Sequence, residues 1–176
     1  MILGVVLAGG QSSRFGSDKA LAEMGGRTLI ARAVDALSGW CEHVVVAGRE
    51  TAPVPTLPDW PHSGMGPLAG LAAALHLARD EGYDEVLSCG VDSVRLPEDL
   101  LELLGTAPAY VAGQPVIGLW PASSSVTLDA LLESKARHSM RAFAEAIGAR
   151  AVKLAQEPAN INTPADLQAQ EHRDGL

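Results

Sequence analysis

Hydrophobic residues along this chain fall into two alternating kinds of segment. Short, continuous apolar runs at residues 2–8, 43–47 and 85–91 are typical of strands that are buried on both faces. Between them, residues 28–38 and 67–81 repeat apolar positions at helical spacing, which predicts amphipathic helices. This alternation predicts an α/β fold of three layers, with a mostly parallel, Rossmann-like sheet between two layers of helices.

Shorter elements are predicted in the remainder of the chain. Residues 108–112 and 116–120 are two apolar runs that could pair as a hairpin, which would depart from a purely parallel sheet. Residues 150–154 predict a last strand, and residues 54–57 predict an edge strand in a proline-rich loop. The polar tail from Gln170 is expected to fray. Further helices are expected to begin at Pro97, Ser123–Ser125, Ser139 and Thr163–Pro164.

The composition is that of a globular protein, with 47% hydrophobic and 19% charged residues. Because no repeat or linker divides it, the chain is predicted to form one domain over residues 1–176. The formal net charge of −8 argues against nucleic acid as a partner, so a polyphosphate would have to be bound by local cations, backbone donors and a divalent metal. No apolar run approaches the ~20 residues that cross a bilayer, and no signal-peptide layout is present. We therefore expect a cytoplasmic protein without a membrane partner.

The first apolar run leads into a loop that is rich in hydrogen-bond donors. Gly9 and Gly10 end the strand, two serines follow at positions 12 and 13, and Arg14 and Lys19 add positive charge. Because phosphate oxygens only accept hydrogen bonds, this loop predicts a polyphosphate site. Its spacing matches neither the P-loop nor the dinucleotide-binding glycine pattern. The alternative is an ordinary surface loop with solvated basic side chains.

An aspartate stands at the end of another predicted strand. Asp92 directly follows residues 85–91, and ligands of open α/β sheets bind at the carboxyl ends of strands. Close to a triphosphate, its carboxylate would be a natural ligand for Mg²⁺. The alternative is that Asp92 caps a turn ahead of Pro97.

Several motifs together resemble a known family. They are Leu-Ala-Gly-Gly at residues 7–10, Ser-Arg-Phe-Gly-Ser-Asp-Lys-Ala-Leu at 13–21, Gly-Gly-Arg-Thr-Leu-Ile at 25–30, Gly-Pro-Leu-Ala-Gly at 66–70 and Asn-Ile-Asn-Thr-Pro-Ala-Asp-Leu at 160–167. They resemble nucleotidyltransferases of the nucleotide-diphospho-sugar transferase type, and among these the molybdenum cofactor guanylyltransferases.

This resemblance implies roles on the nucleotide side. Arg14, Lys19 and Asp92 would be catalytic, and Asp92 would also hold Mg²⁺. Asp59 would accept hydrogen bonds from guanine, or otherwise contact the ribose; considered alone, an aspartate in such a loop is typical of a turn. The implied nucleotide-binding residues are Leu7, Ala8, Gly9, Gly10, Lys19, Asp59, Gly66, Pro67 and Asp92.

The resemblance also implies an acceptor side. Residues two apart in extended chain point the same way, so Asn160 and Asn162 would present their amides to one site. The resemblance implies that this segment contacts the pterin substrate, with Asn162 near the metal or the pterin. Arg141 could meet a substrate phosphate, or be a solvated helix arginine. Where the family often has an asparagine, this chain has Ala47, so that contact is missing or is made by Arg49 or water.

The implied reaction is transfer of GMP from GTP to the phosphate of molybdopterin or molybdenum cofactor, with release of pyrophosphate. Other proteins of cofactor biosynthesis or molybdoenzyme maturation are implied as candidate partners. A close rival is a cytidylyltransferase acting on the same pterin, although such relatives tend to have two alanines where this chain has Gly9 and Gly10. A rival from another class is a non-catalytic nucleotide-binding adaptor in cofactor delivery.

Overall fold

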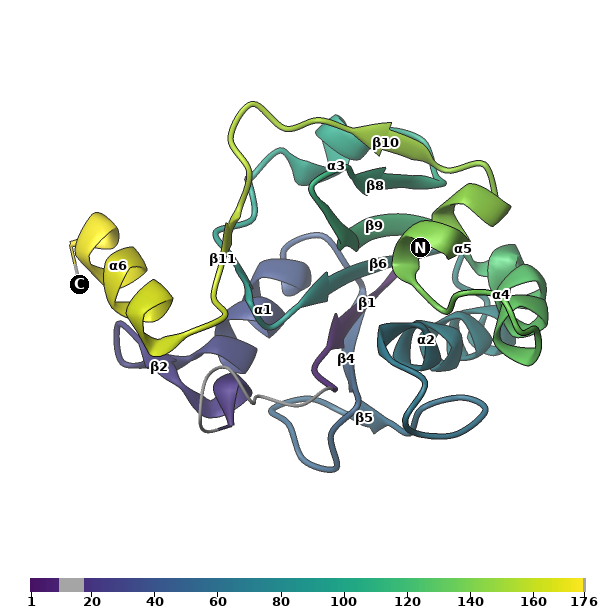
Figure 1. Ribbon diagram of the computed structural model, residues 1–176, viewed down its shortest axis with the longest axis horizontal. Coiled ribbons are helices and arrows are strands. Elements are labelled where there is room, and N and C mark those ends of the chain that lie inside the picture. The colour runs from purple at the N-terminus through teal and green to yellow at the C-terminus, as the bar shows by residue number, and fades with distance from the viewer. Residues whose placement is uncertain (10–17, 176) are drawn as a thin grey trace.

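The structure, a computed structural model, describes residues 1–9 and 18–175 (Figure 1). The described residues form a seven-stranded sheet in the order β10-β8-β9-β6-β1-β4-β5. Its strands are β1 (Ile2–Leu7), β4 (His43–Ala47), β5 (Thr56–Leu57), β6 (Glu85–Gly90), β8 (Ala109–Val111), β9 (Gln114–Pro121) and β10 (Arg150–Val152). The apolar runs thus become strands at the expected places.

One strand breaks the parallel pattern. Both neighbours of β9, the strands β6 and β8, run antiparallel to it, whereas every other adjacent pair in this sheet is parallel. The hairpin of β8 and β9 is the one that the sequence suggested, so the expectation of a mostly parallel sheet is confirmed.

Helices cover both faces of the sheet, as the three-layer prediction requires (Figure 1). They are α1 (Leu29–Ser38), α2 (Pro67–Glu81), α3 (Leu100–Leu104), α4 (Ser125–Glu133) and α5 (Met140–Ala146). A further helix, α6 (Pro164–Asp174), lies to one side of the sheet, where its Leu167 packs with Met24 and Leu29 (Figure 1). Leu3 and Val5 of β1 pack with α2 on one face, and Val6 packs with α1 on the other. Because neighbouring residues of a strand point to opposite faces, a strand covered on both sides is apolar throughout.

Helix starts follow their sequence signals where a polar cap is present. The Thr28 side chain accepts a hydrogen bond from the Ala31 backbone N–H at 3.2 Å and so begins α1. At the start of α6, Thr163 and Asp166 form a reciprocal capping box, with Pro164 in the first turn. These contacts satisfy backbone N–H groups that a helix leaves without an internal partner.

Two small antiparallel ribbons complete the frame and were not expected from the sequence. One joins β2 (Glu23–Met24) to β3 (Arg27–Thr28), and the other joins β7 (Ser93–Val94) to β11 (Ala159–Asn160). The second ribbon matters for the site, because it brings the C-terminal part of the chain beside the end of β6. Short 3₁₀ turns also occur at Lys19–Leu21 and Ala122–Ser124.

Three predictions about element ends are wrong. The tail does not fray at Gln170: α6 continues to Asp174, and Gln170 is buried and donates to the Asp174 carboxylate at 2.9 Å. The helix expected from Pro97 begins at Leu100, and the last strand ends at Val152. In the part of the chain that the structure describes, no helix is both long and apolar enough to span a membrane.

Candidate active site

The predicted site residues follow strands whose carboxyl ends share one edge of the sheet. In the parallel register, Leu7 of β1 lies beside Ala47 of β4 on one side and Gly90 of β6 on the other. The loops after these three strands therefore leave the sheet side by side. This edge is where open α/β sheets bind their ligands.

Lys19 and Asp92 meet at this edge although 73 positions separate them in the chain. The Lys19 ammonium Nζ lies 3.4 Å from Asp92 Oδ2, and the side chains are 18% and 28% exposed, respectively. An ion pair of this length with access to water contributes less than about 1 kcal/mol to stability. The two groups can therefore turn to a charged ligand at little cost to the fold.

Two asparagines extend this cluster from the C-terminal segment. With its amide oriented as its neighbours require, Asn160 donates from its nitrogen to Asp92 Oδ2 at 3.1 Å and to the Asp92 carbonyl oxygen at 3.2 Å. The Asn160 oxygen accepts from Asn162 Nδ2 at 3.2 Å. The backbone N–H of Ile161 also donates to the Asp92 carbonyl at 2.8 Å, which ties this segment to the end of β6.

The Asp166 carboxylate fixes the backbone next to the two site asparagines. It accepts hydrogen bonds from the backbone N–H groups of Asn162, at 3.0 Å, and Thr163, at 2.9 Å. The bond from Asn162 is the largest of the contacts that lower the pKa of Asp166, because these donors stabilise the ionised carboxylate. The capping box at the start of α6 thus also fixes the chain that carries the site amides.

A first cavity has a volume of about 290 Å³, and we call it the nucleotide cavity because several of the residues predicted to bind nucleotide line it. Glycines and backbone make up much of its wall, as expected for a site that a ligand approaches closely. Of the described residues predicted to bind nucleotide, Ala8, Lys19 and Asp92 do not line this cavity. The Ala8 backbone N–H donates to the Ala47 carbonyl at 2.9 Å. The cavity is lined by Leu7, Gly9, Ala47, Gly48, Asp59, Gly64, Gly66, Pro67 and Gly70.

Two glycines are required by the shape of this cavity. Gly48 has a φ of +88°, and a Cβ atom there would lie 2.4 Å from the backbone nitrogen of Gly9. At Gly70, a Cβ would lie 3.0 Å from both the Leu7 and Ala47 side chains. Gly48 therefore allows two backbones to approach closely, Gly70 leaves room for the Leu7 and Ala47 side chains, and Ala47 contributes only a methyl group to the wall.

Asp59 is the acidic group of the nucleotide cavity. Partial burial raises the pKa of its carboxyl group, since the charged form loses contact with water. Within the described ranges, no group donates a hydrogen bond to this carboxylate. A ligand that brings N–H donors would satisfy it.

A second cavity has a volume of about 480 Å³ and includes Asp92 and Asn160 in its wall. We call it the acceptor cavity because the predicted acceptor-binding residues Arg141 and Asn160 line it. Arg141 also lines it and donates to the Ala112 carbonyl at 3.1 Å. Arg137 lines it as well, and the sequence reasoning missed it; a basic residue two positions before the Ser139 cap was the available signal. Asn162 does not line this cavity and reaches it only through Asn160.

The remaining predicted residues are placed as follows. Gly10 and Arg14 lie outside the described residues. Arg49, considered as a substitute for the family asparagine, instead donates to Asp18 Oδ1 at 2.8 Å. This ion pair connects the end of β4 to the residue that precedes Lys19.

Known proteins similar to this chain include several molybdenum cofactor guanylyltransferases. The family model of the MobA-like NTP transferase domain matches residues 4–158. The chain is 37% identical to the molybdenum cofactor guanylyltransferase of Acidiphilium cryptum, over 95% of this chain and 92% of that one. The corresponding protein of Rhodobacter capsulatus is 38% identical, over 98% and 96%.

Solved structures confirm the fold. The molybdopterin-guanine dinucleotide biosynthesis protein A of Archaeoglobus fulgidus superposes with a TM-score of 0.71 at 21% identity, covering 99% of both chains. The 2-C-methyl-D-erythritol 4-phosphate cytidylyltransferase of Thermus thermophilus superposes with a TM-score of 0.63 at 15% identity, covering 98% of both. The predicted nucleotide-diphospho-sugar transferase type of fold is therefore correct.

Proposed function

The chain belongs to the MobA-like NTP transferase family, and on that premise we propose that it transfers GMP from GTP to the phosphate of molybdopterin or molybdenum cofactor. Pyrophosphate is the second product. The family resemblance identified in the sequence is confirmed, and with it the class of enzyme, a nucleotidyltransferase.

One observation carries the assignment of the site: the 3.4 Å contact between Lys19 and Asp92. The nucleotide cavity lies at the ends of β1 and β4, and the acceptor cavity lies at the end of β6, the neighbour of β1. A triphosphate whose base occupies the first cavity would extend past Lys19 and Asp92 toward the second. Both substrates would then meet where the two charged side chains are.

For this reaction the protein must position the two substrates and offset the charge of their phosphates. An oxygen of the acceptor phosphate attacks the α-phosphorus of GTP in line with the departing pyrophosphate, so one P–O bond forms as another breaks. Lys19, with Arg14, would hold the β- and γ-phosphates and stabilise the pyrophosphate as it leaves. Arg141 would hold the acceptor phosphate. No protein nucleophile is needed.

The residues present fit a magnesium ion. Among the residues that the structure describes, no three His, Cys, Asp or Glu side chains form a metal-binding group. Mg²⁺ typically uses one or two protein carboxylates together with substrate phosphates, so Asp92 with the rotatable amide of Asn160 supplies a suitable oxygen set. A divalent ion held by Asp92 would supply positive charge that offsets the charge of the substrate phosphates.

Asp59 supports guanine as the base. Its carboxylate can accept hydrogen bonds from N1–H and the exocyclic amine of guanine together, and among the described residues none donates a hydrogen bond to it. Cytosine does not present this pair of donors. Contact with the ribose would be compatible with either base.

A nucleotide panel tests the proposal. The full chain is incubated with Mg²⁺, molybdopterin and each of GTP, CTP, ATP and UTP, and pyrophosphate release is measured. We expect release with GTP that depends on molybdopterin. Release with CTP instead would establish the cytidylyltransferase, and nucleotide binding without release from any of the four would establish the adaptor.

A further inference from the structure

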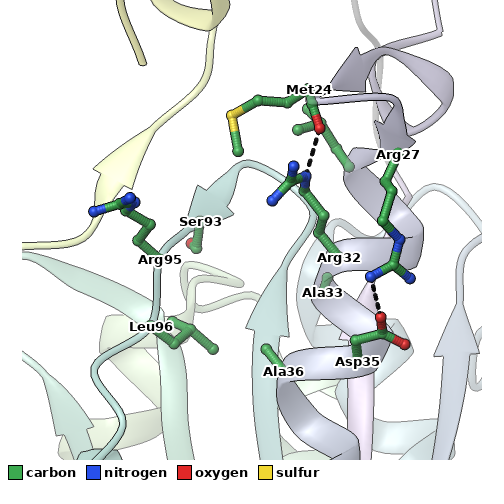
Figure 2. A pocket seen from close by; sticks show the side chains of 10 residues that line it. Met24, Arg27, Arg32, Ala33, Asp35, Ala36, Ser93, Arg95 and Leu96 are labelled. Atoms are coloured by element: carbon green, nitrogen blue, oxygen red, sulfur yellow. Dashed lines mark hydrogen bonds and ion pairs between the residues drawn. The ribbon is translucent and has the colours of Figure 1, made fainter. Parts of the chain in front are cut away.

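A third cavity, of about 280 Å³, lies beside the proposed site, and none of the residues assigned to the transfer reaction lines it (Figure 2). Its walls come from the β2–β3 ribbon, from α1 and from β7 with the loop that follows it. Figure 2 shows Arg32 of α1 facing this space across from Ser93 and Leu96. We call it the Arg32 cavity.

Three arginines line this cavity, although acidic residues outnumber basic ones in the chain, 21 to 13. Two of them are already neutralised. Arg27 forms an ion pair with Asp35, and Arg95 Nε lies 2.8 Å from Asp174 Oδ1. The net positive charge of the cavity therefore comes from the third.

That third arginine, Arg32, is half-buried and held in one orientation. Its Nε donates to the Met24 carbonyl at 2.7 Å, which fixes the plane of the guanidinium group. In the described part of the chain, no group accepts from its two terminal nitrogens. The two terminal nitrogens of a fixed guanidinium group match an oxyanion that accepts two parallel hydrogen bonds.

The rest of the cavity is mostly apolar. Ala33 and Ala36 of α1 form one wall, and Leu96 and the Met24 side chain approach from other sides (Figure 2). A compact dianion such as phosphate would lose its hydration shell against these groups, and a single positive charge would not compensate both of its charges. A monoanion with a short hydrocarbon body fits both parts of the cavity.

We propose that the Arg32 cavity binds a small organic carboxylate. The carboxylate accepts two hydrogen bonds from the terminal nitrogens of Arg32, and the hydrocarbon part packs against Ala33, Ala36 and Leu96. The site does not depend on the identity of the nucleotide or on the transfer reaction. Its volume of about 280 Å³ is large enough for a small organic acid.

The proposal is tested by titrating the full chain with sodium acetate, sodium butyrate and inorganic phosphate at constant ionic strength, followed by amide chemical shifts. Butyrate carries two methylene groups more than acetate, and each buried methylene strengthens binding roughly fourfold. We therefore expect butyrate to bind about fifteenfold more tightly than acetate. Phosphate should bind more weakly than butyrate.

Variants locate the binding. Arg32→Gln should weaken butyrate binding about tenfold or more, because it removes a charge-assisted pair of hydrogen bonds. Lys153→Gln removes the same charge from an exposed position outside the cavity and should leave binding within about twofold. Ala36→Phe keeps the charge but fills the cavity, and should also abolish binding while the melting temperature shows that the variant is folded.

Three outcomes would overturn the proposal: no saturable shifts with butyrate, equal butyrate binding by the wild type and Ala36→Phe, or tighter binding of phosphate than of butyrate. The last outcome would indicate an inorganic-anion site instead. If Arg32→Gln does not fold, the comparison with Ala36→Phe still decides the location.

Discussion

The nucleotide and acceptor cavities are lined by different kinds of groups. The nucleotide cavity lies at the ends of parallel strands and is lined by glycines, a proline and backbone, with Asp59 as its charged group. The acceptor cavity is lined by long polar side chains, among them Arg137, Arg141 and Asn160, which come from loops, a helix and a two-residue ribbon. A backbone-lined cavity selects by shape, whereas a side-chain-lined cavity selects by charge. Substitutions should therefore damage them in different ways.

The largest effect is expected at Asp92, where the two cavities meet. Asp92→Asn should lower GTP-dependent pyrophosphate release about 10³-fold, because it removes charge that positions the metal and the phosphates. Circular dichroism should show an unchanged fold. Asp99→Asn, an exposed acid on the following loop, is the matched control and should be close to wild type. Full activity of Asp92→Asn would refute the metal role.

In the nucleotide cavity, Gly48→Ala should lower the stability of the folded protein. The new Cβ would lie 2.4 Å from the Gly9 nitrogen at a φ of +88°, so Gly9 must move. We expect a loss of about 3 kcal/mol, which corresponds to a drop of roughly 6–12 °C in the melting temperature. Gly26→Ala has a similar φ of +79° and nothing within 4 Å, so its smaller drop measures the backbone strain alone. Equal drops would show that the close approach to Gly9 is unimportant.

In the acceptor cavity, Arg141→Gln should weaken the binding of one substrate, the pterin acceptor. We expect the KM for the pterin acceptor to rise about tenfold and the KM for GTP to stay the same, since the arginine belongs to the acceptor cavity. Steady-state kinetics with each substrate varied in turn measures both values. Arg173→Gln, on the exposed face of α6, serves as the control. A rise in the KM for GTP would contradict the assignment of Arg141 to the acceptor substrate.

The smallest effect concerns the pH dependence of stability at Asp59. Because burial raises the pKa of this acid in the folded state, the folded protein binds a proton more readily than the unfolded one, and stability falls as the pH rises past the unfolded pKa. Asp59→Asn removes this penalty. Its melting temperature should be slightly higher than that of the wild type at pH 7, and the difference should vanish near pH 3. A lower melting temperature at pH 7 would show that the carboxylate has a stabilising partner.

Features that follow from strands and backbone geometry could be predicted from the sequence, whereas features that depend on tertiary contacts could not. The apolar runs at 2–8, 43–47 and 85–91 reveal β1, β4 and β6 because both faces of these strands are buried, and Gly9 and Gly48 mark a close approach of two backbones. The two-residue ribbons have no periodicity to read, so the β7–β11 pairing could not be predicted. Gln170 looks like a tail residue because its burial depends on a tertiary contact with the end of α6.

The candidate site shows the same division. The meeting of Lys19 and Asp92 was predictable, since parallel strands place their carboxyl ends along one edge. Arg137 was not, because the α4–α5 loop reaches the acceptor cavity only through the packing of those helices. The roles of Arg14 and Gly10 stay predictions, because both lie outside the described residues.

The most direct measurement is a crystal structure of the full chain with a non-hydrolysable GTP analogue and Mn²⁺ in place of Mg²⁺. We predict anomalous density for the ion at the Asp92 carboxylate, the β- and γ-phosphates within hydrogen-bond distance of Lys19, and guanine in the cavity beside Asp59. A triphosphate bound instead between Arg137 and Arg141, with no ion at Asp92, would contradict the account.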